Sequence, residues 1–215
     1  MIKLAIIGGG DLGKVIAHLI SELSEYKLVG FFDDYANTEQ LVNVQGFEFP
    51  ILGKTDDVSA QYEKGSFDQL LIGIGYHHFA VRQMMFERWK GKIPFANLIH
   101  PSAIVDKSFR MGEGNVVLAG CVLDKNVVIE NNVLLNIGVT IAHDGHVNDH
   151  SFLGPSCVLA GFVNVGKRCF LGVGSVVIDN IKISDDVQLG GGSLVIDDIS
   201  RRGLYVGSPV RFLKS

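Results

Sequence analysis

The sequence has no apolar run approaching the roughly 20 residues that span a lipid bilayer. The apolar run in its first residues is too short for a secretory signal peptide and lacks a small-residue cleavage site. We therefore expect a cytoplasmic protein without a membrane partner.

Basic clusters and cysteine pairs are also missing. Lys and Arg number 19 against 23 Asp and Glu, a net charge of −4, and no basic run appears, which disfavours nucleic acid as a partner. The three cysteines show no metal-ligand spacing, and a cytoplasmic location disfavours disulfides. We expect buried thiols and no metal site. The cysteines are Cys121, Cys157 and Cys169.

Glycine is abundant, with 26 residues, and much of it lies in a six-residue repeat from Ile104 to Ile199. The second place of every six is aliphatic or Met, from Val105 to Val195, and no insertion breaks the register. The last place is small or apolar in almost every six, and the three cysteines fall there. One six cannot bury its apolar side chain alone, so successive sixes must stack. The repeat predicts an all-β parallel β-helix.

The N-terminal third has a different pattern. An apolar run at Ile2–Ile7 is followed by the glycine motif Gly8-x-Gly10-x-x-Gly13 and by a helical pattern over Asp11–Leu23. A second strand, Lys27–Phe32, ends at Asp33-Asp34. Strand, glycine loop, helix, strand and acid in this order are typical of a Rossmann-like α/β unit that binds a nucleotide. Alternatively, the glycines only permit close helix–strand packing.

The alternation continues to about residue 97. We expect an edge strand at Phe47–Leu52 because of Pro50, a polar connection at Tyr62–Phe67, and then strand, helix and strand. These last elements are Gln69–Ile74, Phe79–Arg88 and Phe95–Ile99. This half is too short for a six-stranded dinucleotide fold and suits a mononucleotide. We predict two domains, residues 1–97 and 98–215.

A histidine in the repeat is a candidate general base. Ile141 points inward, so His143 falls two places later, at a turn, with Asp144 next to it. An imidazole can accept a proton near neutral pH, and a neighbouring carboxylate can fix its tautomer. The alternative is a surface histidine beside a solvated acid. We expect His146 and His150 to point outward as possible substrate or CoA contacts.

Beyond these residues, the chain resembles left-handed β-helix sugar acyltransferases over nearly its whole length. It is most similar to the bacillosamine-type and perosamine-type nucleotide-sugar N-acetyltransferases and the sialic-acid O-acetyltransferases. The shared stretches are IIGGGDLGKVI, FFDD, NLIHPSA, NIGVTIAHD, LGGGS and VGSPVRFLK. The resemblance implies a left-handed coil, an exception to the usual right-handed crossover. It also implies a homotrimer with acetyl-CoA in the groove between neighbouring β-helices.

The resemblance also implies functional residues. The catalytic pair is His143 and Asp144. The nucleotide-linked sugar is expected at Gly8, Gly10, Asp11, Leu12, Asp33 and Asp34. Acetyl-CoA is expected at Phe152, Gly161, Val173 and Gly191. Related enzymes carry a second, CoA-contacting histidine where this chain has Phe152, so that contact must differ. At Gly161 the absence of a side chain is expected to leave room for pantetheine, and a backbone N–H from the Ala160-Gly161 turn is a candidate oxyanion donor.

The predicted function is acetyl-CoA-dependent N-acetylation of the C-4 amino group of an amino deoxy sugar linked to a nucleoside diphosphate. Whether the nucleoside is uridine or thymidine stays open. Three alternatives remain: O-acetylation of a sialic-acid-type sugar, NAD-dependent reduction through the glycine motif, and a β-helix scaffold without catalysis.

Overall fold

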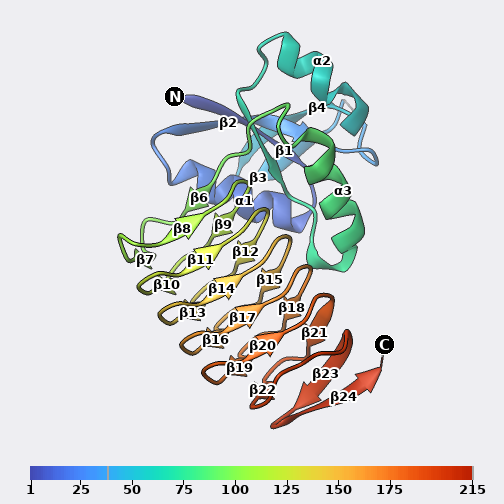
Figure 1. Ribbon diagram of the computed structural model, residues 1–215. Helices are drawn as coiled ribbons and strands as arrows, with labels where there is room; N and C mark the ends of the chain where they lie inside the picture. Colours follow the sequence, from blue (N-terminus) through green and yellow to red (C-terminus); the bar gives the residue numbers. More distant parts are fainter. Residues whose placement is uncertain (38, 215) are drawn as a thin grey trace. The chain divides into compact units, whose positions relative to one another are not determined.

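The computed structural model describes residues 1–37 and 39–214. It divides into two compact units, Met1–Leu98 and Ile99–Ser215. The first is a mixed α/β unit and the second a column of short stacked strands (Figure 1). This confirms the predicted fold class, an α/β half followed by a parallel β-helix. No helix in the described ranges is long and apolar enough to cross a membrane.

The first unit contains a five-stranded sheet in the order β3-β4-β2-β1-β5. Strands β1, β2, β4 and β5 run parallel in neighbouring pairs, and β3 and β4 form an antiparallel hairpin. The strands are β1 (Ile2–Ile7), β2 (Tyr26–Phe32), β3 (Leu41–Val44), β4 (Phe47–Gly53) and β5 (Gln69–Ile72). The helices are α1 (Asp11–Ser21), α2 (Val58–Glu63) and α3 (Phe79–Trp89), with 3₁₀ turns η1 (Thr55–Asp57) and η2 (Tyr76–His78).

Apolar side chains of β1 and β5 alternate between the two faces of this sheet. Ala5 and Ile7 share one buried cluster with Phe86 and Trp89 of α3, and α1 buries its own stripe of Ile16, Leu19 and Ile20. Full burial of one such side chain stabilises the fold by about 1.5–3 kcal/mol. The core thereby fixes the loops that follow β1, β2 and β5 at one edge of the sheet.

Three details of this unit differ from the sequence prediction. Strand β4 is not an edge strand, because β3 pairs on its outer side. Pro50 is tolerated since it lies opposite Leu41 at the end of the β3 ladder, and the β2 ladder begins only at Ile51. Helix α2 and strand β3 were not predicted. The final predicted strand is reduced to β6 (Leu98–Ile99) and an isolated bridge at Phe95.

The second unit stacks sixteen short strands, β7 to β22, into three parallel sheets. Successive strands within each of these three sheets lie 18 residues apart, as Val122 pairs with Thr140. The first sheet contains β7 (Ile104–Val105), β10 (Val122–Leu123), β13 (Thr140–Ile141), β16 (Val158–Leu159), β19 (Val176–Val177) and β22 (Leu194–Val195). The second contains β8 (Arg110–Met111), β11 (Val128–Ile129), β14 (His146–Val147), β17 (Asn164–Val165) and β20 (Lys182–Ile183).

The third sheet of the column is the longest and includes the C-terminal hairpin. Its order is β24-β23-β21-β18-β15-β12-β9-β6. Its remaining strands are β9 (Val116–Val117), β12 (Leu134–Leu135), β15 (Phe152–Leu153), β18 (Phe170–Leu171), β21 (Val187–Leu189), β23 (Gly203–Gly207) and β24 (Val210–Lys214).

The turns between the sheets align into three edges of the column. Residues with a left-handed backbone recur every 18 positions along each edge. Edge A, between the first and second sheets, carries Asn126, Asp144, Phe162 and Asn180. Edge B, between the third and first sheets, carries Gly120, Gly138, Ser156, Gly174 and Gly192. Edge C, between the second and third sheets, carries Gly114, Asn132, His150, Arg168 and Asp186. Gly, Asn and Asp suit these positions because they tolerate positive φ.

The inside of the column is a continuous apolar core formed by the second and last places of the sixes. All three cysteines lie in it with no exposed surface. Their thiols donate to backbone carbonyls, as Cys157 Sγ does to the Gly172 oxygen at 3.0 Å. The thiols are therefore buried in the core, as expected.

Candidate active site

The His143 imidazole stands on edge A of the column. Ile141 on β13 is fully buried, so the chain turns outward two residues later, before β14 begins. The His143 side chain is 49% exposed. The ring therefore faces outward, where a substrate can reach it, and not into the core.

Asp144 fixes one side of that ring. Its Oδ2 lies 3.0 Å from His143 Nδ1, and its Oδ1 accepts a hydrogen bond of 3.0 Å from Asn126 Nδ2, one coil earlier. The bond from Asn126, followed by that from His143, lowers the pKa of the Asp144 carboxyl below its usual value. An ionised carboxylate accepts a hydrogen bond from Nδ1–H, which holds the proton on Nδ1 and leaves the Nε2 lone pair available as a base.

Gly161, one coil later, contacts another side of the ring. A Cβ built there would lie 2.7 Å from His143 Cε1 and 2.8 Å from Nε2. The space expected to admit pantetheine is therefore filled by the imidazole itself. Within residues 1–37 and 39–214 the Gly161 N–H has no hydrogen-bond acceptor, so it can donate to a ligand. His143, Asp144 and Gly161 form one cluster.

The other residues expected at acetyl-CoA lie elsewhere on the column. Val173, which is 58% exposed, and Gly191 are neighbours on edge B, where a Gly191 Cβ would lie 3.1 Å from Val173 Cγ1. Phe152 lies on β15 of the third sheet, is 5% exposed and packs against Phe170 with ring centroids 5.8 Å apart. Within one chain, the fold does not bring these residues to His143.

A shallow hollow of about 520 Å³ covers the outer face of β7, β10 and β13 and reaches Ala142, the residue before His143. The surrounding first sheet presents apolar side chains outward, with Ile104 68% exposed, Val158 37% and Val176 38%. An apolar sheet face of this kind is typical of a surface that another molecule covers.

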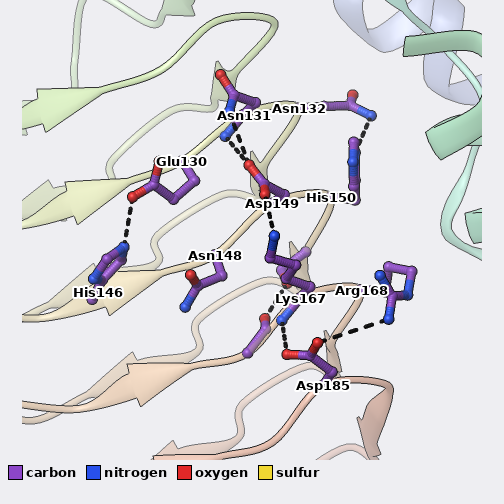
Figure 2. Close-up of polar contacts among 12 residues, drawn as sticks. Glu130, Asn131, Asn132, His146, Asn148, Asp149, His150, Lys167, Arg168 and Asp185 are labelled. Atoms are coloured by element: carbon purple, nitrogen blue, oxygen red, sulfur yellow. Dashed lines mark hydrogen bonds and ion pairs between the residues drawn. The ribbon is translucent and has the colours of Figure 1, made fainter. Parts of the chain in front are cut away.

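His146 and His150 each contact another residue of the same column (Figure 2). His146 points outward, as expected, and its Nε2 lies 2.9 Å from Glu130 Oε1. The expectation for His150 was wrong, because its side chain is buried, 2% exposed, with Nδ1 3.0 Å from Asn132 Nδ2. Edge C stacks its polar turn residues coil upon coil, which encloses this ring.

The neighbouring charges of edge C also pair with each other. Lys167 Nζ lies 3.0 Å from Asp149 Oδ2, and Arg168 contacts Asp186 at 2.7 Å (Figure 2 shows Asp149, Lys167 and Arg168). Hydrogen bonds from Asn131 contribute with Lys167 to lowering the pKa of Asp149 to about 2, although burial alone would raise it. These contacts tie successive coils together.

The glycine loop of the first unit contains two kinds of glycine. Gly8 has φ +103°, and a Cβ at Gly13 would collide with the Gly8 carbonyl, so both are required by packing. A Cβ at Gly10 would meet nothing within 4 Å. The open space at Gly10 is where a ligand can approach the backbone that leads into α1, with Asp11 and Leu12 in its first turn.

The two predicted acids differ in their contacts. Asp33 Oδ2 accepts the Gly9 N–H at 2.9 Å, so it stands beside the glycine loop. Asp34 accepts both the N–H and the hydroxyl of Thr55, at 2.8 and 3.0 Å, and thereby holds the start of η1. Asp33 Oδ1 also accepts the Tyr35 N–H at 2.9 Å, so both acids are held by local contacts, and Asp33 is the one that stands beside the glycine loop.

Two features of these sites were missed from the sequence. Gly73, directly after β5, packs on the glycine loop, since a Cβ there would lie 2.8 Å from Gly13 Cα. The doublet Gly73-x-Gly75 after an apolar strand was the available signal. Phe162, at 5.1 Å between ring centroids, packs edge-to-face on His143. No group of three or more possible metal ligands occurs in the described ranges.

Known proteins match both halves of the chain. The PglD N-terminal domain family matches residues 3–89. A crystal structure of a mutant GDP-perosamine N-acetyltransferase from Caulobacter crescentus, in complex with CoA and GDP-perosamine, is 30% identical. It superposes with a TM-score of 0.90, covering 99% of this chain and 97% of that one.

Two further relatives are also acetyltransferases. The acetyltransferase domain of PglB from Neisseria gonorrhoeae FA1090, in complex with acetyl coenzyme A, is 27% identical with a TM-score of 0.88 and 98% coverage of each chain. The UDP-N-acetylbacillosamine N-acetyltransferase of Bacillus subtilis (strain 168) is 37% identical over 120 residues, 55% of this chain and 52% of that enzyme. The chain therefore belongs to the nucleotide-sugar N-acetyltransferases built on a left-handed β-helix.

Proposed function

We propose that the protein transfers the acetyl group of acetyl-CoA to the C-4 amino group of an amino deoxy sugar linked to a nucleoside diphosphate. The observation that carries this proposal is the exposed imidazole of His143, with its Nδ1 on Asp144 and its Cε1 and Nε2 against the open Cβ side of Gly161. The similar enzymes named above act on perosamine and bacillosamine nucleotides, which supports an amine acceptor.

His143 acts as the general base in this reaction. As the sugar amine attacks the thioester carbonyl carbon, Nε2 takes a proton from the amine nitrogen. The Gly161 N–H donates to the oxygen that becomes negative in the tetrahedral intermediate. When the intermediate collapses, the carbon–sulfur bond breaks, and the imidazolium returns its proton to the CoA sulfur. The products are an amide and free CoA, and the enzyme is unchanged.

Asp144 supports both halves of this cycle. It holds the Nδ1–H tautomer before proton transfer and stabilises the imidazolium afterwards, since its own carboxyl has a lowered pKa and stays ionised. Its second hydrogen bond, from Asn126, keeps the carboxylate aimed at the ring.

The first unit binds the nucleotide part of the acceptor. Gly8, Gly10, Asp11 and Leu12 contact the phosphates and sugar, and the open approach at Gly10 supports this role. Asp33 and Asp34 contact the ribose or base, and Asp33 stands beside the glycine loop.

The working enzyme is a homotrimer, and acetyl-CoA binds in the grooves between its columns. The apolar first sheet and the hollow beside Ala142 support an interface there. Edges A and B flank that sheet, so a groove between two chains can place Gly161 of one column near Val173 and Gly191 of the next. Phe152 packs against acetyl-CoA, at the position where related enzymes have a histidine.

An acceptor panel tests the proposal. The purified protein is incubated with radiolabelled acetyl-CoA and with UDP-, dTDP- or GDP-linked 4-amino sugars, with free sialic acid as the O-acetylation control. Transfer to a nucleotide-linked amine, located on C-4 by NMR, supports the proposal. Transfer to sialic acid alone refutes it. Quenching of NADH fluorescence at micromolar protein, without acetyl transfer, would instead support a reductase.

A further inference from the structure

Phe162 breaks the residue pattern of edge A. Its backbone has φ +60°, in the left-handed region, where the same place in neighbouring coils is held by Asn126, Asp144 and Asn180. Asn and Asp tolerate this conformation, whereas a bulky side chain there is a strained outlier. Strain of this kind is kept where the surrounding structure or the function requires it.

The fold does not require this side chain. Phe162 is 54% exposed and lies outside the buried core of the column, and its backbone N–H donates to the His143 carbonyl at 3.1 Å as any residue would. An asparagine would satisfy the turn with less strain and expose less apolar surface. The benzyl group therefore has to be explained by what it contacts.

What it contacts is the catalytic imidazole. The two rings meet edge-to-face, with centroids 5.1 Å apart and an interplanar angle of 87°. With Asp144 at Nδ1 and Gly161 beneath Cε1 and Nε2, Phe162 is the third group that bounds a ring whose remaining surface is open. A half-exposed histidine held by one hydrogen bond alone would sample several rotamers.

We propose that Phe162 is a positioning residue that confines the His143 ring to the rotamer in which Nε2 meets the acceptor amine. This inference rests on the proposed role of His143 as general base. The edge-to-face contact favours one ring orientation by an amount that corresponds to a population ratio of about 2- to 12-fold. The strain at φ +60° persists because this orientation raises turnover.

The test replaces Phe162 with the residue that edge A uses in adjacent coils. Phe162→Asn is expected to melt at or above the wild-type temperature and to lower kcat about 2- to 12-fold, with KM for both substrates unchanged. Phe162→Tyr keeps the ring and is expected to restore kcat. In NMR spectra, the Cε1–H signal of His143 should lose its ring-current shift in Phe162→Asn and keep it in Phe162→Tyr.

His143→Ala is measured in parallel to separate the two proposals. If His143→Ala is inactive and Phe162→Asn retains wild-type kcat, the positioning role is refuted and the general base stands. If Phe162→Asn raises KM at unchanged kcat, Phe162 is a substrate contact and the inference fails. A melting temperature below wild type for Phe162→Asn would refute the strain argument. Full activity of His143→Ala would remove the general-base role of His143, and this inference with it.

Discussion

A single methyl group at Gly161 should slow acetyl transfer strongly without unfolding the enzyme. In Gly161→Ala the new Cβ would lie 2.7 Å from His143 Cε1 and 2.8 Å from Nε2, whereas carbon atoms normally approach to about 3.5–4.0 Å. Because the imidazole is the movable partner and is 49% exposed, the ring must retreat by about 1 Å. Its 3.0 Å contact with Asp144 and its packing on Phe162 cannot both survive that shift.

Activity and stability should therefore change in opposite ways. A misplacement of about 1 Å at a reacting group can reduce the rate about 10²-fold, so we expect kcat for acetyl transfer to fall by about that factor. The Gly161 backbone lies outside the left-handed region, where replacing Gly by Ala stabilises a protein by about 0.4–1 kcal/mol through the unfolded chain. The melting temperature should stay the same or rise by up to about 4 °C.

The assay is steady-state acetyl transfer followed by release of the CoA thiol, with thermal unfolding by circular dichroism. Asp179→Ala serves as the control, because it leaves only a Cβ at the corresponding turn position one coil further along edge A and removes just the hydrogen bond that Asp179 accepts from Asn180. The control should keep wild-type kcat. Wild-type kcat in Gly161→Ala, or a loss of activity explained by a lower melting temperature, would refute the reasoning.

The other predictions concern charge, burial and the tautomer. Asp149→Asn should lower stability at pH 7 by about 1–2 kcal/mol, since the carboxylate pairs with Lys167. Because the pKa of Asp149 is lowered to about 2 in the folded state, its contribution is present above about pH 4 and lost as pH falls toward 2. Melts from pH 7 to 2 check this, and an unchanged pH dependence in the variant would contradict it. Burial raises the thiol pKa of Cys157 to about 11 and of Cys169 to about 12, so iodoacetamide at pH 8 should label neither before unfolding. Rapid labelling of the native protein, detected by mass spectrometry, would exclude their burial. Asp144→Asn keeps a residue suited to φ +58° and should melt like wild type, while kcat falls about tenfold or more because the tautomer is no longer fixed. Unchanged kcat would show that the carboxylate does not orient His143.

The column was predictable in detail because its signal is local and repeated. The inward side chains from Val105 to Val195 lie at a fixed place in each six-residue unit. Only stacking of successive units buries all of them. The same register predicted that Ile141 points in and His143 out. The pairing of His143 with Asp144 was also predictable, since the two residues are neighbours in the sequence.

Contacts between coils or across the sheet were harder to predict. The burial of His150 depends on edge C, where its partner Asn132 comes from the coil before. Gly161 was predicted to leave room for pantetheine, because the sequence alone does not show that the His143 ring lies against it. In the first unit, Pro50 suggested an edge strand, and only the pairing of Leu41 with it shows that β3 lies outside.

Replacement of His143 tests the central claim most directly. In single-turnover experiments with saturating acetyl-CoA and nucleotide-linked amino sugar, His143→Ala should transfer acetyl about 10²- to 10⁴-fold more slowly than wild type, with the affinity for both substrates unchanged. Acetyl transfer by His143→Ala at the wild-type rate would contradict the assignment of His143 as the base.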